Sequence, residues 1–99
     1  MAATPEKKVK TNVAKQLKAL DAYYFFPATG GFGRSGVPDI VGCYRGYFFA
    51  IECKAGKNTT TPLQDKEIQD ITNAGGHVVV VNESNMNEVT EWLSRKQHK

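Results

Sequence analysis

The sequence lacks any apolar run that approaches the roughly 20 residues of a membrane-spanning helix. It contains only two cysteines, Cys43 and Cys53, which excludes a disulfide framework and fits buried thiols in a reducing compartment. The first ten residues have no apolar segment, so a signal peptide is not expected at this end. We therefore expect an intracellular protein that does not associate with membranes.

A strong excess of charge of one sign is also lacking, because 13 lysines and arginines stand against 10 aspartates and glutamates. The resulting net charge of +3 is compatible with nucleic acid as a partner, but it does not establish binding. A chain of 99 residues can bury only a modest core. This length predicts a single domain over residues 1–99.

Hydrophobic periodicity and turn residues predict seven elements in the order α-β-β-β-α-β-α. These are a helix over 5–21 capped by Thr4, strands over 23–26, 39–44 and 47–54, a helix over 62–75 capped by Thr61, a buried strand over 77–81, and a last helix that Asn85 and Glu88 cap. The helix before the last strand implies a parallel crossover. The expected fold class is α/β, with a central mixed sheet flanked by helices. The aromatic residues of the first and third strands are expected in the core or at a subunit interface.

Only two residues separate the strands predicted at 39–44 and 47–54, which indicates a tight hairpin. Counting outward from this turn places Asp39 directly opposite Glu52, and paired residues have Cβ atoms about 4.5–5.5 Å apart. Lys54 follows Glu52 by two positions, so it shares the same face of the sheet. The hairpin therefore brings two carboxylates and one ammonium group to a single patch.

Two opposed carboxylates repel each other unless a positive charge lies between them. A divalent cation such as Mg²⁺ or Mn²⁺ would suit carboxylate oxygens, polarise a phosphoryl oxygen and lower the pKa of a bound water. Lys54 would then orient that water or neutralise charge on the phosphate. A surface salt bridge between Lys54 and either acid explains the same spacing equally well, and a bulge would shift the register.

Two further polar residues admit a structural and a functional explanation. Glu6 falls on the apolar stripe of the first helix, where an acid is costly unless it is paired or binds metal. Its position in the first turn, where the helix dipole favours negative charge, explains the acid without any function. Gln64 either completes a capping box with Thr61 or helps to place water or phosphate near a metal.

Residues 31–36 fit a G-x-G-x-x-G pattern, but they lead into a strand instead of a helix, which excludes a dinucleotide-binding loop. We expect either a flexible loop or one that covers the active site, with Arg34 touching phosphate. Four lysines are candidates for contacts with a phosphate backbone, although a solvated surface explains each of them singly. These lysines are Lys7, Lys8, Lys10 and Lys57.

Three segments together resemble the VRR-NUC family, the virus-type replication-repair nuclease branch of the PD-(D/E)XK superfamily. They are residues 36–39 (GVPD), 50–54 (AIECK) and 61–64 (TPLQ). The resemblance extends from Glu6 to about Trp92, and it implies a restriction-endonuclease-like core. The stretch 55–60 departs from the family, which often has a more basic, proline-bearing segment there.

The resemblance assigns catalytic roles to five residues, namely Glu6, Asp39, Glu52, Lys54 and Gln64. It implies that Asp39 and Glu52 ligate Mg²⁺ or Mn²⁺ together with the backbone carbonyl of Cys53, and that Lys54 is the catalytic lysine. Glu6 is similar to the family's first-helix glutamate and Gln64 to its later-helix glutamine. No small-molecule cofactor is implied.

The implied activity is metal-dependent endonucleolytic hydrolysis of DNA phosphodiester bonds, with branched DNA such as Holliday junctions as substrate. Small family members form homodimers, and stand-alone members are mostly viral, so a homodimer in the cytoplasm of a host cell is expected by analogy. Two alternatives stay open: a non-catalytic nucleic-acid-binding module on the same fold, and a monomer that nicks flaps or single strands. A site-specific restriction-type nuclease is disfavoured, because 99 residues leave little room for a base-reading element.

Overall fold

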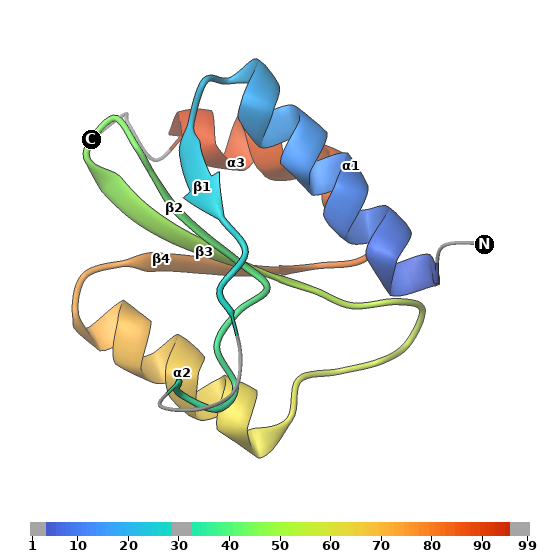
Figure 1. Ribbon diagram of the computed structural model, residues 1–99, viewed down its shortest axis with the longest axis vertical. Helices are drawn as coiled ribbons and strands as arrows, with labels where there is room; N and C mark the ends of the chain where they lie inside the picture. Colours follow the sequence, from blue (N-terminus) through green and yellow to red (C-terminus); the bar gives the residue numbers. More distant parts are fainter. Residues whose placement is uncertain (1–3, 29–32, 96–99) are drawn as a thin grey trace.

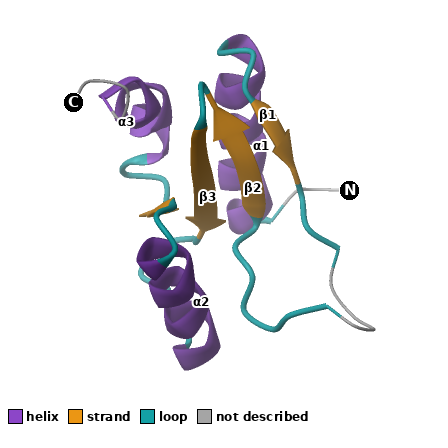
Figure 2. Ribbon diagram, turned by 90° about the vertical axis from the view of Figure 1, so that its left-hand side faces the viewer, coloured by secondary structure: helices purple, strands orange, loops and turns teal. Residues whose placement is uncertain are grey.

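The computed structural model describes residues 4–28 and 33–95 of the chain. A four-stranded sheet lies between two layers of helix (Figure 1). Helices α1 (Pro5–Ala19) and α3 (Val89–Arg95) cover one face, and α2 (Pro62–Asn73) packs on the other (Figure 2). The α/β class with a central sheet flanked by helices is therefore confirmed. No helix in these two described ranges has the length and hydropathy of a membrane span.

The strands lie in the order β1 (Tyr23–Phe25), β2 (Ile40–Tyr44), β3 (Tyr47–Cys53) and β4 (His77–Val81) across the sheet. The first three strands are antiparallel to their neighbours, whereas β3 and β4 are parallel. Helix α2 makes the parallel crossover that the sequence predicts, and a short 3₁₀ turn, η1 (Met86–Glu88), leads into α3. The mixed sheet and the order α-β-β-β-α-β-α are therefore confirmed.

Helix α1 begins at the predicted cap and faces the core with the predicted stripe. The Thr4 hydroxyl accepts a hydrogen bond from the Lys7 backbone N at 3.1 Å, and proline occupies the first turn. The apolar side chains that face the sheet from α1 and α3 are completely or almost completely buried. With the inward residues of the strands they form the core, which comprises Val9, Val13, Leu17, Ile40, Phe49, Ile51, Cys53, Val81, Val89 and Leu93.

Gly42 allows β1 and β2 to approach each other closely over this core. A Cβ atom added at Gly42 would lie 2.1 Å from the Tyr23 carbonyl oxygen and 2.6 Å from Cζ of Phe49. Any side chain there would displace either β1 or the buried Phe49 ring, which explains a glycine inside a strand.

For the aromatic residues of the first and third strands, the expectation of core burial is wrong at several positions, whereas a place at a subunit interface stays a prediction. Tyr23, Phe25 and Phe48 are 68%, 46% and 44% exposed and lie on the α2 side of the sheet. Helix α2 packs against β4 and leaves the β1–β2 half of this face open. The expectation of a buried last strand is also wrong, because β4 is an edge strand with Val80 37% exposed.

The two cysteines are free, as predicted, but only one of them is buried. Cys53 points into the core, whereas Cys43 pairs with Tyr23 on the open face of the sheet and is exposed. The expectation of two buried thiols is therefore wrong for Cys43.

The predicted cap of the last helix is also wrong, because the Asn85 side chain forms no capping hydrogen bond. Its Oδ1 instead accepts a hydrogen bond from the Asn82 backbone N at 2.7 Å, and its Nδ2 donates to the Val80 carbonyl oxygen at 3.3 Å. Asn85 therefore closes the turn after β4, and the chain enters α3 through η1.

Candidate active site

The β2–β3 hairpin has the register that places the two central acids together. Ile40 pairs with Ile51, and the turn consists of Arg45 and Gly46, whose φ angles of 50° and 89° suit a two-residue hairpin loop. The next position outward from the Ile40–Ile51 pair sets Asp39 opposite Glu52.

Asp39 is held at the start of β2 by the backbone of β3. Its Oδ2 accepts a hydrogen bond from the Cys53 backbone N at 2.9 Å, and its Oδ1 lies 3.7 Å from Nζ of Lys10. The carboxylate therefore lies beside the backbone of Cys53, whose carbonyl oxygen is the third predicted metal ligand.

Glu52 is a buried acid, with 3% of the residue exposed. Its Oε2 lies 3.5 Å from Nζ of Lys54 and accepts a hydrogen bond from Nε2 of Gln64 at 3.0 Å. The pKa of Glu52 is raised to about 7, chiefly by burial and then by the charge of Asp39, against the opposing effect of Lys54. A cation bound beside Glu52 would stabilise its ionised form, so the carboxyl is suited to metal binding.

Lys54 enters the site from the end of β3, where its backbone N donates to the Val81 carbonyl oxygen at 2.8 Å. It forms an ion pair with Glu52, as the alternative of a simple salt bridge required, but this pair does not lie on the surface. The two side chains are 11% and 4% exposed. Since a buried ion pair is a weak source of stability, the surface salt bridge no longer explains these residues.

Gln64 completes the capping box and also contacts Glu52, whereas a role in placing water or phosphate stays a prediction. Its Oε1 accepts from the Thr61 backbone N at 2.9 Å, and its own backbone N donates to the Thr61 hydroxyl at 3.2 Å, which completes the capping box. Its Nε2 remains available to donate to Glu52. One side chain thus caps α2 and orients the central carboxyl group.

Glu6 lies half-buried in the first turn of α1. Its negative charge also raises the pKa of Glu52, although less than burial and Asp39 do. Glu6 is therefore within electrostatic reach of Glu52, as expected for an acid that faces the site.

We expect Glu6→Gln to lower the rate of DNA cleavage by about tenfold, as removal of a group that supports a metal site commonly does. Stability should not fall, because the loss of charge at the helix N-terminus is offset by weaker repulsion with Glu52. Single-turnover cleavage and thermal unfolding of the same preparations measure the two effects. Glu91→Gln, which removes an exposed first-turn acid from α3, is the matched control. Unchanged cleavage by Glu6→Gln would remove this residue from the mechanism.

Lys10 belongs to the site, whereas the sequence indicated only a contact with the phosphate backbone. Its Nζ lies 3.7 Å from Oδ1 of Asp39 and 5.9 Å from the centroid of the Phe26 ring. Each central carboxylate therefore has its own lysine, Lys10 for Asp39 and Lys54 for Glu52. The spacing of four residues from Glu6 could have indicated this position, because it places both side chains on one face of α1.

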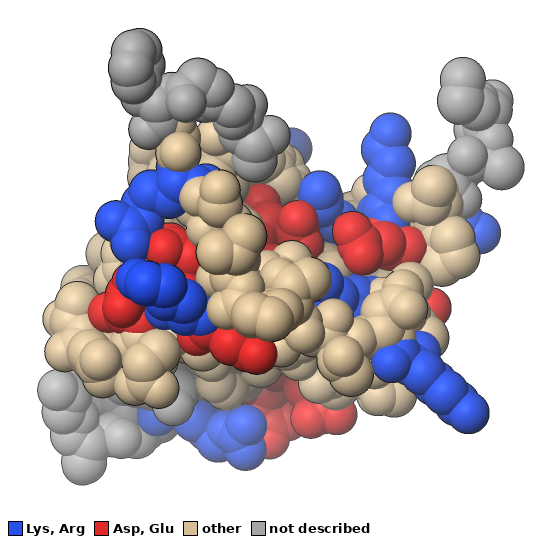
Figure 3. Space-filling model, turned by 90° about the horizontal axis from the view of Figure 1, so that it is seen from below, with Lys and Arg blue, Asp and Glu red and all other residues tan. Residues whose placement is uncertain are grey.

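The other predicted DNA contacts lie outside this cluster. Lys7, Lys8 and Lys57 are exposed, and Arg34 binds acids of α2 instead of facing Asp39 and Glu52. Residues 31 and 32 of the glycine-rich loop lie outside the described residues. Seen from the α2 side, acidic and basic side chains are interspersed, and several basic ones project at the edge of the molecule (Figure 3).

The donor set fits a hard divalent cation. Asp39 and Glu52 supply carboxylate oxygens and Cys53 can supply a carbonyl oxygen, which suits Mg²⁺ or Mn²⁺ with several retained waters. No group of three or more His, Cys, Asp or Glu residues that could hold a metal ion occurs in 4–28 and 33–95. An ion at this place would therefore depend on these two carboxylates, one carbonyl and water.

A solved structure described as "VRR_NUC domain" superimposes on the chain with a TM-score of 0.73. The match covers 90% of this chain and 97% of the other, at 23% sequence identity. The chain has the VRR_NUC fold. No family model and no curated protein matches the sequence. This fold agrees with the restriction-endonuclease-like core that the resemblance of the three segments implied.

Proposed function

We propose that the chain is a metal-dependent deoxyribonuclease of the VRR-NUC family. Its active site, formed by Asp39, Glu52 and Lys54, hydrolyses phosphodiester bonds of DNA. The observation that carries this proposal is the burial of Glu52 among Asp39, Lys54 and Gln64 on a nuclease-type fold. Perturbed carboxyl groups of this kind are common at catalytic centres.

Some of the site residues would hold the metal, and others would stabilise charge or position a neighbour. Asp39, Glu52 and the Cys53 carbonyl would hold Mg²⁺ or Mn²⁺, which when bound supplies a Lewis acid for a phosphoryl oxygen and an acidified water. Lys54 orients the attacking water or neutralises the charge that develops on the phosphate. Gln64 keeps the Glu52 carboxyl in place through its 3.0 Å hydrogen bond.

Lysines around the first turns of α1 and in the loop before α2 are the proposed contacts with the DNA backbone. Lys7 and Lys8 are exposed on the helix that carries Glu6, and Lys57 is exposed three residues after Lys54. Lys10, which faces Asp39, would meet the phosphate closest to the site. Such contacts position the substrate without reading its sequence.

The rival function is a nucleic-acid-binding module without catalysis. Such a module would keep the basic residues, but it would have no use for Asp39 and Glu52. Here both acids are present and Glu52 is buried, an arrangement that costs stability unless a cation compensates for it. The retained acids therefore favour the enzyme.

The open aromatic face of the sheet supports a homodimer. Tyr23, Phe25 and Phe48 are substantially exposed, and Phe25 and Phe48 line a groove of about 720 Å³ together with Ile71 of α2. Apolar patches of this kind usually mark an interface. Two copies related by a two-fold axis would present two active sites, which matches the approximate symmetry of a four-way DNA junction.

We expect the protein to be a dimer at micromolar concentration and to make paired, symmetric cuts in a four-way junction with Mg²⁺ or Mn²⁺. Light scattering or sedimentation measures the first expectation. Cleavage of a labelled junction, flap, splayed arm and plain duplex, with an EDTA control, measures the second. A monomer that cuts flaps but makes no paired cuts in a junction would rule out the dimer, and it would favour the alternative of a flap or single-strand nuclease.

A further inference from the structure

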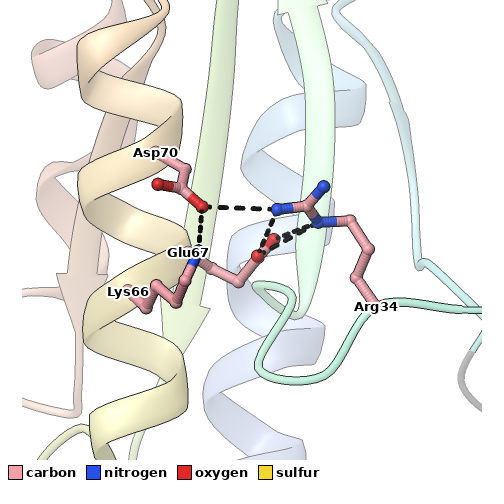
Figure 4. Close-up of polar contacts among 4 residues, drawn as sticks. All are labelled: Arg34, Lys66, Glu67 and Asp70. Carbon is pink, nitrogen blue, oxygen red and sulfur yellow. Dashed lines mark hydrogen bonds and ion pairs between the residues drawn. The ribbon is translucent and has the colours of Figure 1, made fainter.

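Glu67 of α2 is a second buried acid, and it does not belong to the Asp39–Glu52 pair. It is 7% exposed, and its carboxylate is bound by the guanidinium of Arg34 (Figure 4). Arg34 Nε lies 3.1 and 3.0 Å from the two Glu67 oxygens, and Nη2 lies 2.8 Å from Oε2. Nη2 also lies 3.3 Å from Oδ2 of Asp70, which in turn binds Nζ of Lys66 at 2.8 Å.

The loop that carries Arg34 also touches the first turn of α2 with its backbone. At Gly36, φ is +77°, and an added Cβ would lie 2.5 Å from both C and O of Leu63 and 2.9 Å from N of Gln64. Only glycine allows this approach. The loop is thus fastened to α2 at two places, through Gly36 against the Leu63–Gln64 peptide and through Arg34 on Glu67.

We propose that the Arg34–Glu67 pair positions the active site by fixing the loop before Asp39 against the helix that carries Gln64. This inference rests on the proposed function. Glu67 lies three residues after Gln64 on neighbouring turns of α2, and the loop runs directly from Gly36 into Asp39. The pair therefore sets the distance between Asp39 and the Gln64 amide, which both act on Glu52. Arg34 is a positioning residue, because it touches neither Asp39 nor Glu52.

The geometry favours positioning over a contact between Arg34 and DNA phosphate. The Arg34 side chain is 65% exposed, but its Nε and Nη2 atoms, one of the two forks of the guanidinium, are directed at Glu67. A bidentate pair fixes direction as well as distance, which a lysine in its place would not do. Metal ligands need placement within about 0.5 Å, so a small shift of the loop would be felt at Asp39.

The test is a double-mutant cycle of Arg34→Met and Glu67→Gln in the full chain, with Mn²⁺ binding measured by titration calorimetry. Each single variant is expected to weaken Mn²⁺ binding and to lower kcat by about tenfold with little change in KM. The double variant should bind Mn²⁺ no more weakly, and have a kcat no lower, than either single variant. Arg95→Met is the control, since it removes an equally exposed arginine from an ion pair on α3, and it should bind Mn²⁺ like the wild type. If Arg34→Met does not fold, Arg34→Lys keeps the charge without the fork and should show the same loss.

Wild-type Mn²⁺ affinity in folded Arg34 and Glu67 variants would overturn the inference. It would also be overturned if Arg34→Met alone weakened metal-free DNA binding and lowered the salt dependence by about one charge. That result would make Arg34 a phosphate contact. A wild-type protein that binds Mn²⁺ but cuts no DNA would end the proposed function and leave the effect on Mn²⁺ binding standing. Normal DNA cleavage by the wild type and by both variants would end the positioning role of the Arg34–Glu67 pair and leave the proposed function standing.

Discussion

Lys54→Met is expected to lower the rate of DNA cleavage by about 10³-fold while the protein still binds Mn²⁺. The Lys54 ammonium is one of the positive charges closest to Glu52, at 3.5 Å from Oε2, and its side chain is only 11% exposed. In this position it can stabilise charge on a phosphate in a site from which most water is excluded. Methionine retains much of the volume of the lysine stem and removes only the ammonium group.

The expected loss is in the chemical step, so single-turnover cleavage is the measurement. Mn²⁺ binding should be measured at mildly alkaline pH, because loss of Lys54 removes an influence that lowers the pKa of Glu52. Lys18→Met removes an exposed lysine from the last turn of α1 and should cut at the wild-type rate. Wild-type cleavage by Lys54→Met would exclude the lysine from the mechanism.

Glu52→Gln is expected to abolish Mn²⁺ binding and cleavage and to make the metal-free protein more stable at neutral pH. The pKa of Glu52 is about 7 in the folded protein, compared with 4.5 for an unperturbed glutamate. Between these values the folded protein keeps a proton that the unfolded chain has lost, so stability falls as the pH rises. Glutamine resembles the protonated acid at every pH and does not suffer this loss.

Thermal unfolding of metal-free protein between the two pKa values measures this effect. The unfolding midpoint of the wild type should fall with rising pH more steeply than that of Glu52→Gln, and added Mn²⁺ should raise only the wild-type midpoint. Asp39, Lys54 and Glu6 all influence the same pKa, so the slope reports the whole cluster. Glu91→Gln, an exposed acid on α3, should follow the wild type. Equal pH dependence in the wild type and Glu52→Gln would contradict the account.

The centre of the site was predictable from the sequence because a two-residue turn leaves the hairpin little freedom to slip. With Arg45 and Gly46 at the tip, the register that pairs Ile40 with Ile51 follows by counting, and so does the meeting of Asp39 and Glu52. The starts of α1 and α2 were predictable for a similar reason, since the caps Thr4 and Thr61 act within four residues.

Contacts between distant segments could not be predicted in this way. Arg34 and Glu67 are 33 residues apart, and no periodicity connects a loop residue to a face of α2. The exposure of Tyr23 and Phe48 depends on which half of the sheet α2 covers, which is decided by packing and not by strand alternation. The sequence offered Lys10 only a contact with the phosphate backbone or a place on a solvated helix face, and only the fold brings it to Asp39.

Metal-dependent cleavage that requires the Glu52 carboxyl is tested with one labelled DNA junction, cut by the wild type and by Glu52→Gln. The two proteins should be purified identically and incubated with Mg²⁺, with Mn²⁺ and with EDTA. The wild type is expected to cut the junction with either ion and not in EDTA, and Glu52→Gln is expected to cut it under none of these conditions. Wild-type cleavage in EDTA, or equal cleavage by Glu52→Gln with metal, would contradict this expectation.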